Sequence, residues 1–325
     1  MHSVCIEHLN QPLVLADWCD LTNVLSLTGC LSIGMNLMVL AMFVRFPDLL
    51  TSTNVLILHL ALTDVGVSSL GYPLSAASAW RGQWSFGWIG CQIYAAVNIF
   101  FGMASIALLT LVAVDRYLII CRPHRGDHTI FAAPIVLAWC NALFWATAPL
   151  FGWAAYAPDP TGTTCTVHWR HADTSFMTYT LAVVFVNFVI PFGAMCFCYG
   201  QVWRSLRHRH ENSTNKACVT AITDLNNQRA VTKMSMMMIA AFLVAWSPYA
   251  VICLWASFGN PHDIPGPMAI IAPLFAKSST FYNPIIYIST NACFRKALMH
   301  LLRCHSHQAF TLNHSSPCGS QIPLT

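Results

Sequence analysis

The sequence predicts an all-α membrane protein built as a bundle of seven transmembrane helices. Only 9% of its 325 residues are charged and 56% are hydrophobic, whereas a soluble domain carries about 25% charged residues. Segments apolar and long enough to cross a bilayer occupy residues 23–45, 54–77, 89–120, 131–153, 176–203, 230–258 and 266–289. Since these segments and short loops use nearly the whole chain, we expect no second domain.

The chain divides into a predicted extracellular tail at 1–22, a transmembrane domain at 23–289, and a cytoplasmic end at 290–325 with a short amphipathic helix. Thirteen of the sixteen Lys and Arg residues fall on one side of the predicted membrane. Because such residues gather in cytoplasmic loops, the N-terminus is predicted to lie outside. The net charge of +4 reflects those loops and gives no sign of nucleic-acid binding. The apolar spans make the lipid bilayer the expected partner. The polar stretch 205–229 is predicted to be a cytoplasmic loop.

The cysteines sort by side of the membrane. In this topology only Cys5, Cys19, Cys91 and Cys165 face the oxidising exterior. Cys91 opens the third span and Cys165 lies between the fourth and fifth, so a disulfide between them would tie that loop across the bundle. Cys5 and Cys19 could form a second bridge, although free thiols in the tail are the expected state. Cys304 follows the amphipathic segment and is a candidate for palmitoylation, and no residue spacing predicts a metal site.

Lys277 is the only basic residue predicted to lie deep inside a span, because the others in these segments fall near the span ends. An ammonium group at the centre of a bilayer costs roughly 2.5–3.5 kcal/mol even on lenient insertion scales, which makes it a functional candidate. Removal from water favours the neutral amine, a nucleophile that can form a Schiff base with an aldehyde. The alternative is a structural lysine that pairs with a carboxylate or extends to the interface. Position alone does not separate the two.

Other polar residues and prolines interrupt the spans. Asn36, Asp64 and Asn283 lie in spans one, two and seven, and we expect them to meet in the interior through water, because a lone carboxylate in lipid is costly. Pro248 and Pro284 remove backbone hydrogen bonds and predict kinks in spans six and seven.

Several motifs occur in a fixed order. Asp115-Arg116-Tyr117 ends span three, and Asn283-Pro284-Ile285-Ile286-Tyr287 ends span seven. We expect Arg116 to pair with Asp115 at rest and to be released for a partner. Together with the kink motif around Pro248, this order resembles the family A G-protein-coupled receptors over almost the full chain.

The lysine indicates a branch of that family. A lysine six residues before Asn283-Pro284 resembles the opsins, in which retinal is bound at this residue as a Schiff base, so the resemblance implies retinal at Lys277. Residues 99–105, 157–162 and 267–279 resemble the peropsin group of opsins. That likeness implies a plasma-membrane protein of the retinal pigment epithelium.

A positive Schiff base needs a counterion. Visual pigments carry a glutamate three residues after the span-three cysteine, but this chain has Tyr94 there. Asp159 matches the loop acid of other opsins, so we expect Asp159 to be the counterion and Tyr94 to donate a hydrogen bond. The alternative is that Asp159, between Pro158 and Pro160, is a turn residue in a solvated loop.

Aromatic residues supply the expected pocket. Trp246 and Tyr249, three residues apart beside the Pro248 kink, can sandwich a polyene, and Gly102 leaves room for it. Trp169 and Phe188 are further candidates, although aromatic residues in a helix bundle more often serve packing alone.

Two functions follow from the resemblance. One is a photoisomerase-like pigment that converts all-trans retinal to the 11-cis form, and the other is a light-activated receptor for a heterotrimeric G protein. The intact motifs favour signalling, whereas Gln228 replaces an acid that often pairs with the span-three arginine, which weakens the resting lock. A receptor for a diffusible amine or peptide that happens to carry Lys277 is the third alternative.

Overall fold

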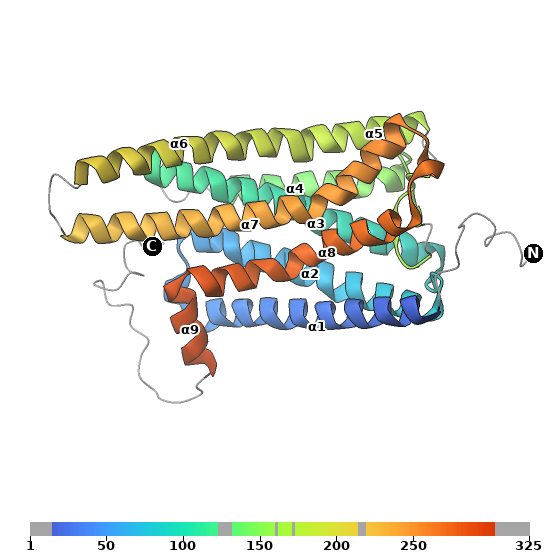
Figure 1. Cartoon of the computed structure of the whole chain (residues 1–325), viewed down its shortest axis with the longest axis horizontal. Coiled ribbons are helices and arrows are strands. Elements are labelled where there is room, and N and C mark those ends of the chain that lie inside the picture. Colours follow the sequence, from blue (N-terminus) through green and yellow to red (C-terminus); the bar gives the residue numbers. More distant parts are fainter. Residues whose placement is uncertain (1–14, 123–131, 160–161, 171–172, 214–218, 303–325) are drawn as a thin grey trace, which may run out of the picture.

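The protein folds into a bundle of helices closed at one end by a small hairpin (Figure 1). The computed structural model describes residues 15–122, 132–159, 162–170, 173–213 and 219–302. The first four spans are α1 (Leu15–Arg45), α2 (Ser52–Arg81), α3 (Gly87–Cys121) and α4 (Ala132–Thr147). The fifth joins α5 (Thr174–Val184), a π-helical turn (Phe185–Val189) and α6 (Ile190–Ser213), and the bundle is completed by α7 (Val219–Phe258) and α8 (Gly266–Thr290). The predicted fold class is confirmed.

Two predicted boundaries differ from the structure. Helix α1 begins at Leu15, inside the segment predicted as a tail. The loop predicted at 205–229 is wrong for most of its length, since α6 continues to Ser213 and α7 begins at Val219. The physical reason is that a helix already formed in the membrane propagates into water one residue at a time and avoids the cost of nucleation.

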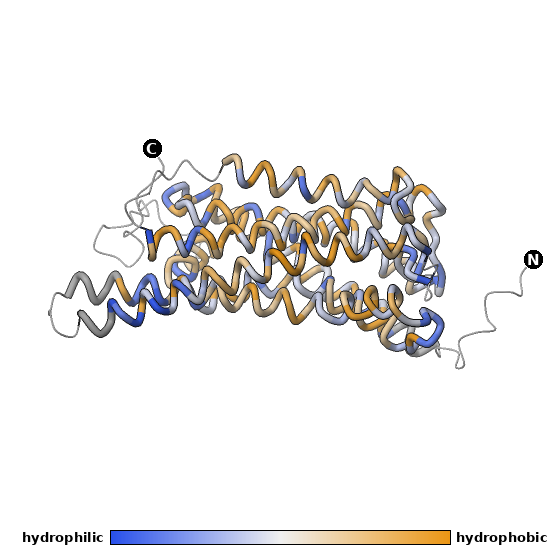
Figure 2. The backbone as a smooth tube through the Cα atoms, turned by 90° about the horizontal axis from the view of Figure 1, so that it is seen from above, coloured by the Kyte–Doolittle hydropathy of each residue, from blue (hydrophilic) through white to orange (hydrophobic). Residues whose placement is uncertain are grey.

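Hydropathy follows the long axis of the bundle. Apolar residues dominate the middle of the helices and polar residues their ends (Figure 2). Among the described residues, six helices are long and apolar enough to cross a membrane, and α8 is not one of them. Two polar runs, Lys277 to Thr280 and Tyr282 to Pro284, lower the hydropathy of α8. This helix is instead held by protein, because it packs against α7, α1 and α2.

Of the three polar residues predicted to meet, Asp64 and Asn283 are in direct contact and Asn36 is bonded elsewhere. Asn283 Nδ2 donates to Asp64 Oδ2 at 3.0 Å. Asn36 Nδ2 instead donates to the Thr280 carbonyl at 2.8 Å. That carbonyl lies four residues before Pro284, which has no N–H to donate to it. Asn36 therefore supplies the hydrogen bond that the proline kink removes.

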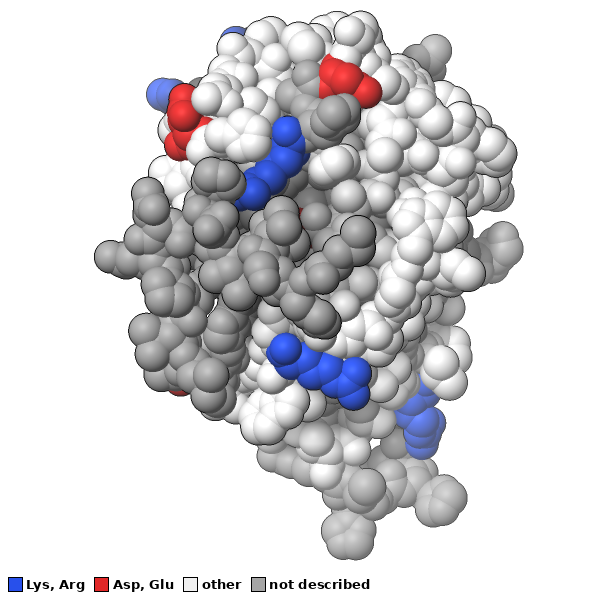
Figure 3. All heavy atoms as spheres, turned by 90° about the vertical axis from the view of Figure 1, so that its right-hand side faces the viewer, with Lys and Arg blue, Asp and Glu red and all other residues white. Residues whose placement is uncertain are grey.

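The hairpin forms a lid at the end of the bundle nearest the N-terminus. Strand β1 (Tyr156–Pro158) pairs antiparallel with β2 (Cys165–Val167), with Pro158 opposite Cys165. The predicted disulfide joins Cys91 at the start of α3 to Cys165. Figure 3 looks onto this end, where few charged side chains show on the described part of the surface, as expected for the extracellular face.

Helix α9 (Ala292–Leu302) lies across the opposite end of the bundle (Figure 1). The fully buried ring of Phe294 contacts that of Tyr287, with 5.6 Å between centroids. This contact attaches α9 to the end of α8, and it matches the short helix predicted for the cytoplasmic end.

Candidate functional site

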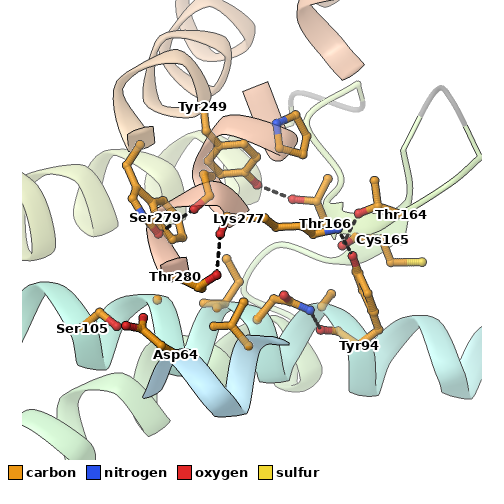
Figure 4. Close-up of a pocket in the computed structure, with 18 of the residues that line it drawn as sticks. Asp64, Tyr94, Ser105, Thr164, Cys165, Thr166, Tyr249, Lys277, Ser279 and Thr280 are labelled. Carbon is orange, nitrogen blue, oxygen red and sulfur yellow. Dashed lines mark hydrogen bonds between the residues drawn. The ribbon is translucent and has the colours of Figure 1, made fainter. Parts of the chain in front are cut away.

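A cavity of about 640 Å³ lies beneath the hairpin, between α2, α3, α7 and α8 (Figure 4). Its walls are mostly apolar or aromatic side chains, and the basic side chain among them is that of Lys277. The lining residues include Tyr94, Gly102, Thr166, Trp246, Tyr249 and Lys277.

Lys277 reaches across this cavity from α8. Its side chain is 9% exposed, and its Nζ donates to the Ser75 hydroxyl at 2.6 Å and the Tyr94 hydroxyl at 2.5 Å. These two hydroxyl oxygens are themselves 2.6 Å apart. Two of the three ammonium donors thus have neutral oxygen partners from α2 and α3. The Tyr72 hydroxyl donates to the Lys277 carbonyl at 2.9 Å and holds the helix turn that carries the amine.

Asp159 lies just after β1 and is only 7% exposed. Its Oδ1 accepts the Thr164 N–H at 3.3 Å across the hairpin turn. It also lines a smaller cavity, of about 260 Å³, together with Ser75 and Lys277. The residue therefore serves the turn, as the alternative interpretation expects, but it is buried on the Lys277 side. Its counterion role remains a prediction.

A second cavity, of about 690 Å³, lies between α3, the fifth span and α7. The two cavities adjoin, because they share the lining residues Ile99, Gly102, Phe242, Trp246 and Tyr249. A Cβ atom built on Gly102 would lie 2.6 Å from the Trp246 ring. Gly102 therefore lies directly against the indole, and the expectation that it leaves room for a ligand remains a prediction.

The aromatic candidates occupy different places. The Trp246 indole stacks on Phe242 at 5.5 Å and donates from Nε1 to the Ser279 hydroxyl at 3.3 Å. Tyr249 is hydrogen-bonded to Thr166 of β2, which joins the lid to α7 next to the Pro248 kink.

The two weaker aromatic candidates, Phe188 and Trp169, lie in different parts of the structure. Phe188 lines the second cavity. Trp169 is buried near the lid, lines none of the three cavities, and has the Arg170 guanidinium 5.8 Å from its ring. Only Phe188 therefore lies where a ligand in these cavities could touch it.

The predicted pair at the other end of the bundle is present. Arg116 Nη2 lies 2.6 Å from Asp115 Oδ2, and both side chains are buried. Thr53 of α2 also binds both partners, donating to Asp115 Oδ2 at 2.6 Å and accepting from Arg116. Nη1 of Arg116 and Oε1 of Gln228 are buried without a hydrogen bond to any described residue. The pair is thus held from α2.

The third residue of the Asp115-Arg116-Tyr117 motif also lies at this end of the bundle. The Tyr117 ring packs on Phe197 with centroids 5.9 Å apart. The predicted lipidation site, Cys304, lies outside the described residues, as do the side chains of Cys5 and Cys19.

Sequence reasoning missed Ser75, Thr53 and Thr166. Each is a small hydroxyl residue, and such residues occur throughout these spans. Nothing in the local pattern marked which of them face Lys277, Asp115 or Tyr249, because these partners come from other helices.

The comparisons with known proteins agree with this geometry. The pattern of the 7 transmembrane receptor (rhodopsin family) matches residues 35–287. The human visual pigment-like receptor peropsin is 52% identical over 92% of this chain and 89% of that protein. Mouse Opsin-5 is 34% identical over 81% of this chain and 71% of its own length.

A solved structure gives the same fold. The crystal structure of squid rhodopsin superimposes with a TM-score of 0.85 and 26% identity, over 98% of this chain and 96% of that one. The chain therefore belongs to the rhodopsin family of seven-transmembrane receptors and, within it, to the peropsin group of opsins.

Proposed function

We propose that this opsin-type photoreceptor binds retinal covalently at Lys277 and isomerises it in light, from all-trans to 11-cis. The attachment is a condensation, in which Nζ forms a Schiff base with the aldehyde carbon and the aldehyde oxygen leaves as water. The observation that carries the proposal is a buried amine at the wall of an apolar cavity.

The two cavities fit a long, apolar aldehyde. Small-molecule sites are typically lined by apolar and aromatic side chains with polar groups at a few fixed points, and both cavities have apolar and aromatic side chains on their walls. They share lining residues that include Gly102 and Trp246, and in this proposal a chain tethered at Lys277 runs past the indole and places its far end in the second cavity. Retinal supplies the photochemistry when bound, and the protein supplies orientation and charge.

The chain's own residues would hold the proton and exclude water. Ser75 and Tyr94 accept from Nζ, and Asp159, which lines the small cavity together with Lys277, is the candidate for a compensating negative charge. The hairpin, fixed by the Cys91–Cys165 bond, covers this end of the site.

The direct test of attachment is borohydride fixation. Purified protein is incubated with all-trans retinal, reduced, and denatured, and the retained chromophore is measured. We expect retention by the unaltered protein and by Lys233→Ala, whose lysine lies in the first half of α7, and none by Lys277→Ala. Retention by the Lys277 variant would contradict the proposal.

The alternative is that light-activated signalling to a G protein is the main role and isomerisation is incidental. The buried Asp115–Arg116 pair, which a receptor would have to release, favours it. Retinal isomers should be extracted before and after illumination, beside a light-dependent GTP-exchange assay. Conversion to 11-cis without exchange supports the isomerase role, and exchange supports the receptor.

The resemblance also suggests where the protein acts. We place it in the plasma membrane of the retinal pigment epithelium, which immunolocalisation in eye sections would test. Palmitoylation of Cys304 is part of the same proposal, and mass spectrometry of the purified protein measures it.

A further inference from the structure

The second cavity has a polar residue on an otherwise mainly apolar wall. Asn187 lies in the π-helical turn of the fifth span, a local widening of the helix that is frequent at functional sites. Its side chain is only 4% exposed and lines the cavity. The proposed function uses Lys277 at the other end of the site and leaves this residue without a role.

A chain of hydrogen bonds fixes the orientation of its amide. Trp145 Nε1 donates to Asn141 Oδ1 at 3.0 Å, and Asn141 Nδ2 donates to Asn187 Oδ1 at 2.8 Å. An indole N–H can only donate, so Asn141 must present its oxygen to Trp145 and its nitrogen to Asn187. The oxygen of Asn187 is thereby the acceptor, and its Nδ2 is left as a donor.

That donor has no partner among the described residues. Other polar groups of the same wall are used, since the Tyr179 hydroxyl donates to the Trp145 carbonyl at 2.8 Å and the Tyr249 hydroxyl is bonded to Thr166. A buried donor left unpaired is costly. The hydrocarbon ring of retinal has no atom that could accept from it.

We propose that Asn187 recognises an oxygen on the far end of the ligand, so that the site prefers a retinal bearing a hydroxyl or keto group on its ring. This rests on the proposed function, because attachment at Lys277 is what directs the ring past Trp246 into the second cavity. Both groups have an oxygen that can accept from Nδ2. A site with a buried donor discriminates against the analogue that lacks the acceptor.

The test is competition between two probes in the full-length protein. All-trans retinal and its ring-hydroxylated analogue are titrated by visible absorbance, and each adduct is then fixed with borohydride. We expect the hydroxylated probe to bind about tenfold more tightly to the unaltered protein. In Asn187→Leu, which keeps the size and removes the donor, the ratio should fall to about one.

A matched control changes the same wall without touching a donor. Val183 also lines the second cavity. Val183→Ala should weaken the binding of both probes by a similar factor and leave the ratio of their affinities unchanged. If Asn187→Leu does not fold, Asn187→Ala replaces it.

Equal affinity of the two probes for the unaltered protein would overturn the inference and would indicate that a water satisfies Nδ2. A preference that survives removal of the amide would overturn it as well. Failure of both probes to become fixed at Lys277 is a different result, and it would contradict the proposed function.

Discussion

A single methyl group added at Gly102 should test whether the indole of Trp246 divides the ligand site. The Cβ of Gly102→Ala would lie 2.6 Å from Cη2 and 2.8 Å from Cζ2 of Trp246. Ordinary contact begins at 3.4 Å, so the gap must open by 3.4 − 2.6, or about 0.8 Å. The ring cannot swing away freely, because it stacks on Phe242 and is bonded to Ser279.

The expected penalty follows from this overlap. Overpacking of this kind costs about 1–3 kcal/mol, which corresponds to about 5–150-fold in an affinity. The indole lines both cavities, so its displacement should narrow the passage between them. We therefore expect Gly102→Ala to bind all-trans retinal about 5–150-fold more weakly.

Titration with retinal, followed by visible absorbance, measures the effect. Gly193→Ala in α6 and Gly34→Ala in α1 are the matched controls, since a Cβ there meets nothing within 4 Å. These two substitutions change only the helix propensity, by about 1 kcal/mol. The affinity of each variant for retinal should lie within about twofold of that of the unaltered protein. If Gly102→Ala titrates like its controls, the indole does not limit the passage and the reasoning is refuted.

Three further changes test the polar contacts. Asp159→Asn removes the candidate counterion, so the pigment should absorb in the near-ultraviolet at neutral pH and recover a visible band only at lower pH. An unchanged spectrum would show that Asp159 is not the counterion. Tyr94→Phe removes one acceptor of Lys277 Nζ, and a hydrogen bond to a charged group contributes about 1.5–3 kcal/mol. The visible band of this variant should therefore also be lost at a lower pH than in the unaltered pigment, as measured by the same spectral titration. A titration matching the unaltered pigment would rule out that contribution. Asn36→Ala leaves the Thr280 carbonyl unpaired and should destabilise the protein by about 1–3 kcal/mol, seen as a lower thermal unfolding midpoint, whereas an unchanged midpoint would show that the carbonyl finds another donor.

The loop that was wrongly predicted illustrates one limit of sequence reasoning. Residues 205–229 are polar and charged, which is typical of a loop, but α6 and α7 continue into this stretch. Composition reports solubility, whereas helix continuation depends on a helix that the membrane has already formed.

The sequence by itself predicted the helical spans and the disulfide, and it gave the predictions of their direction and of a role for Lys277. These follow from local energetics, since apolar length, charge in lipid and the redox side of a cysteine are properties of single segments. A charged group inside a span stands out without any knowledge of its neighbours.

Only the tertiary structure decided what surrounds that lysine. Its partners Ser75 and Tyr94 are 202 and 183 residues away in the chain. The ring of Trp246 lies where a side chain on Gly102 would have to go. Helical periodicity identifies a face of one helix, but which side chains meet across the bundle depends on how the helices are rotated and packed. The second cavity and the unpaired amide of Asn187 arise from that packing.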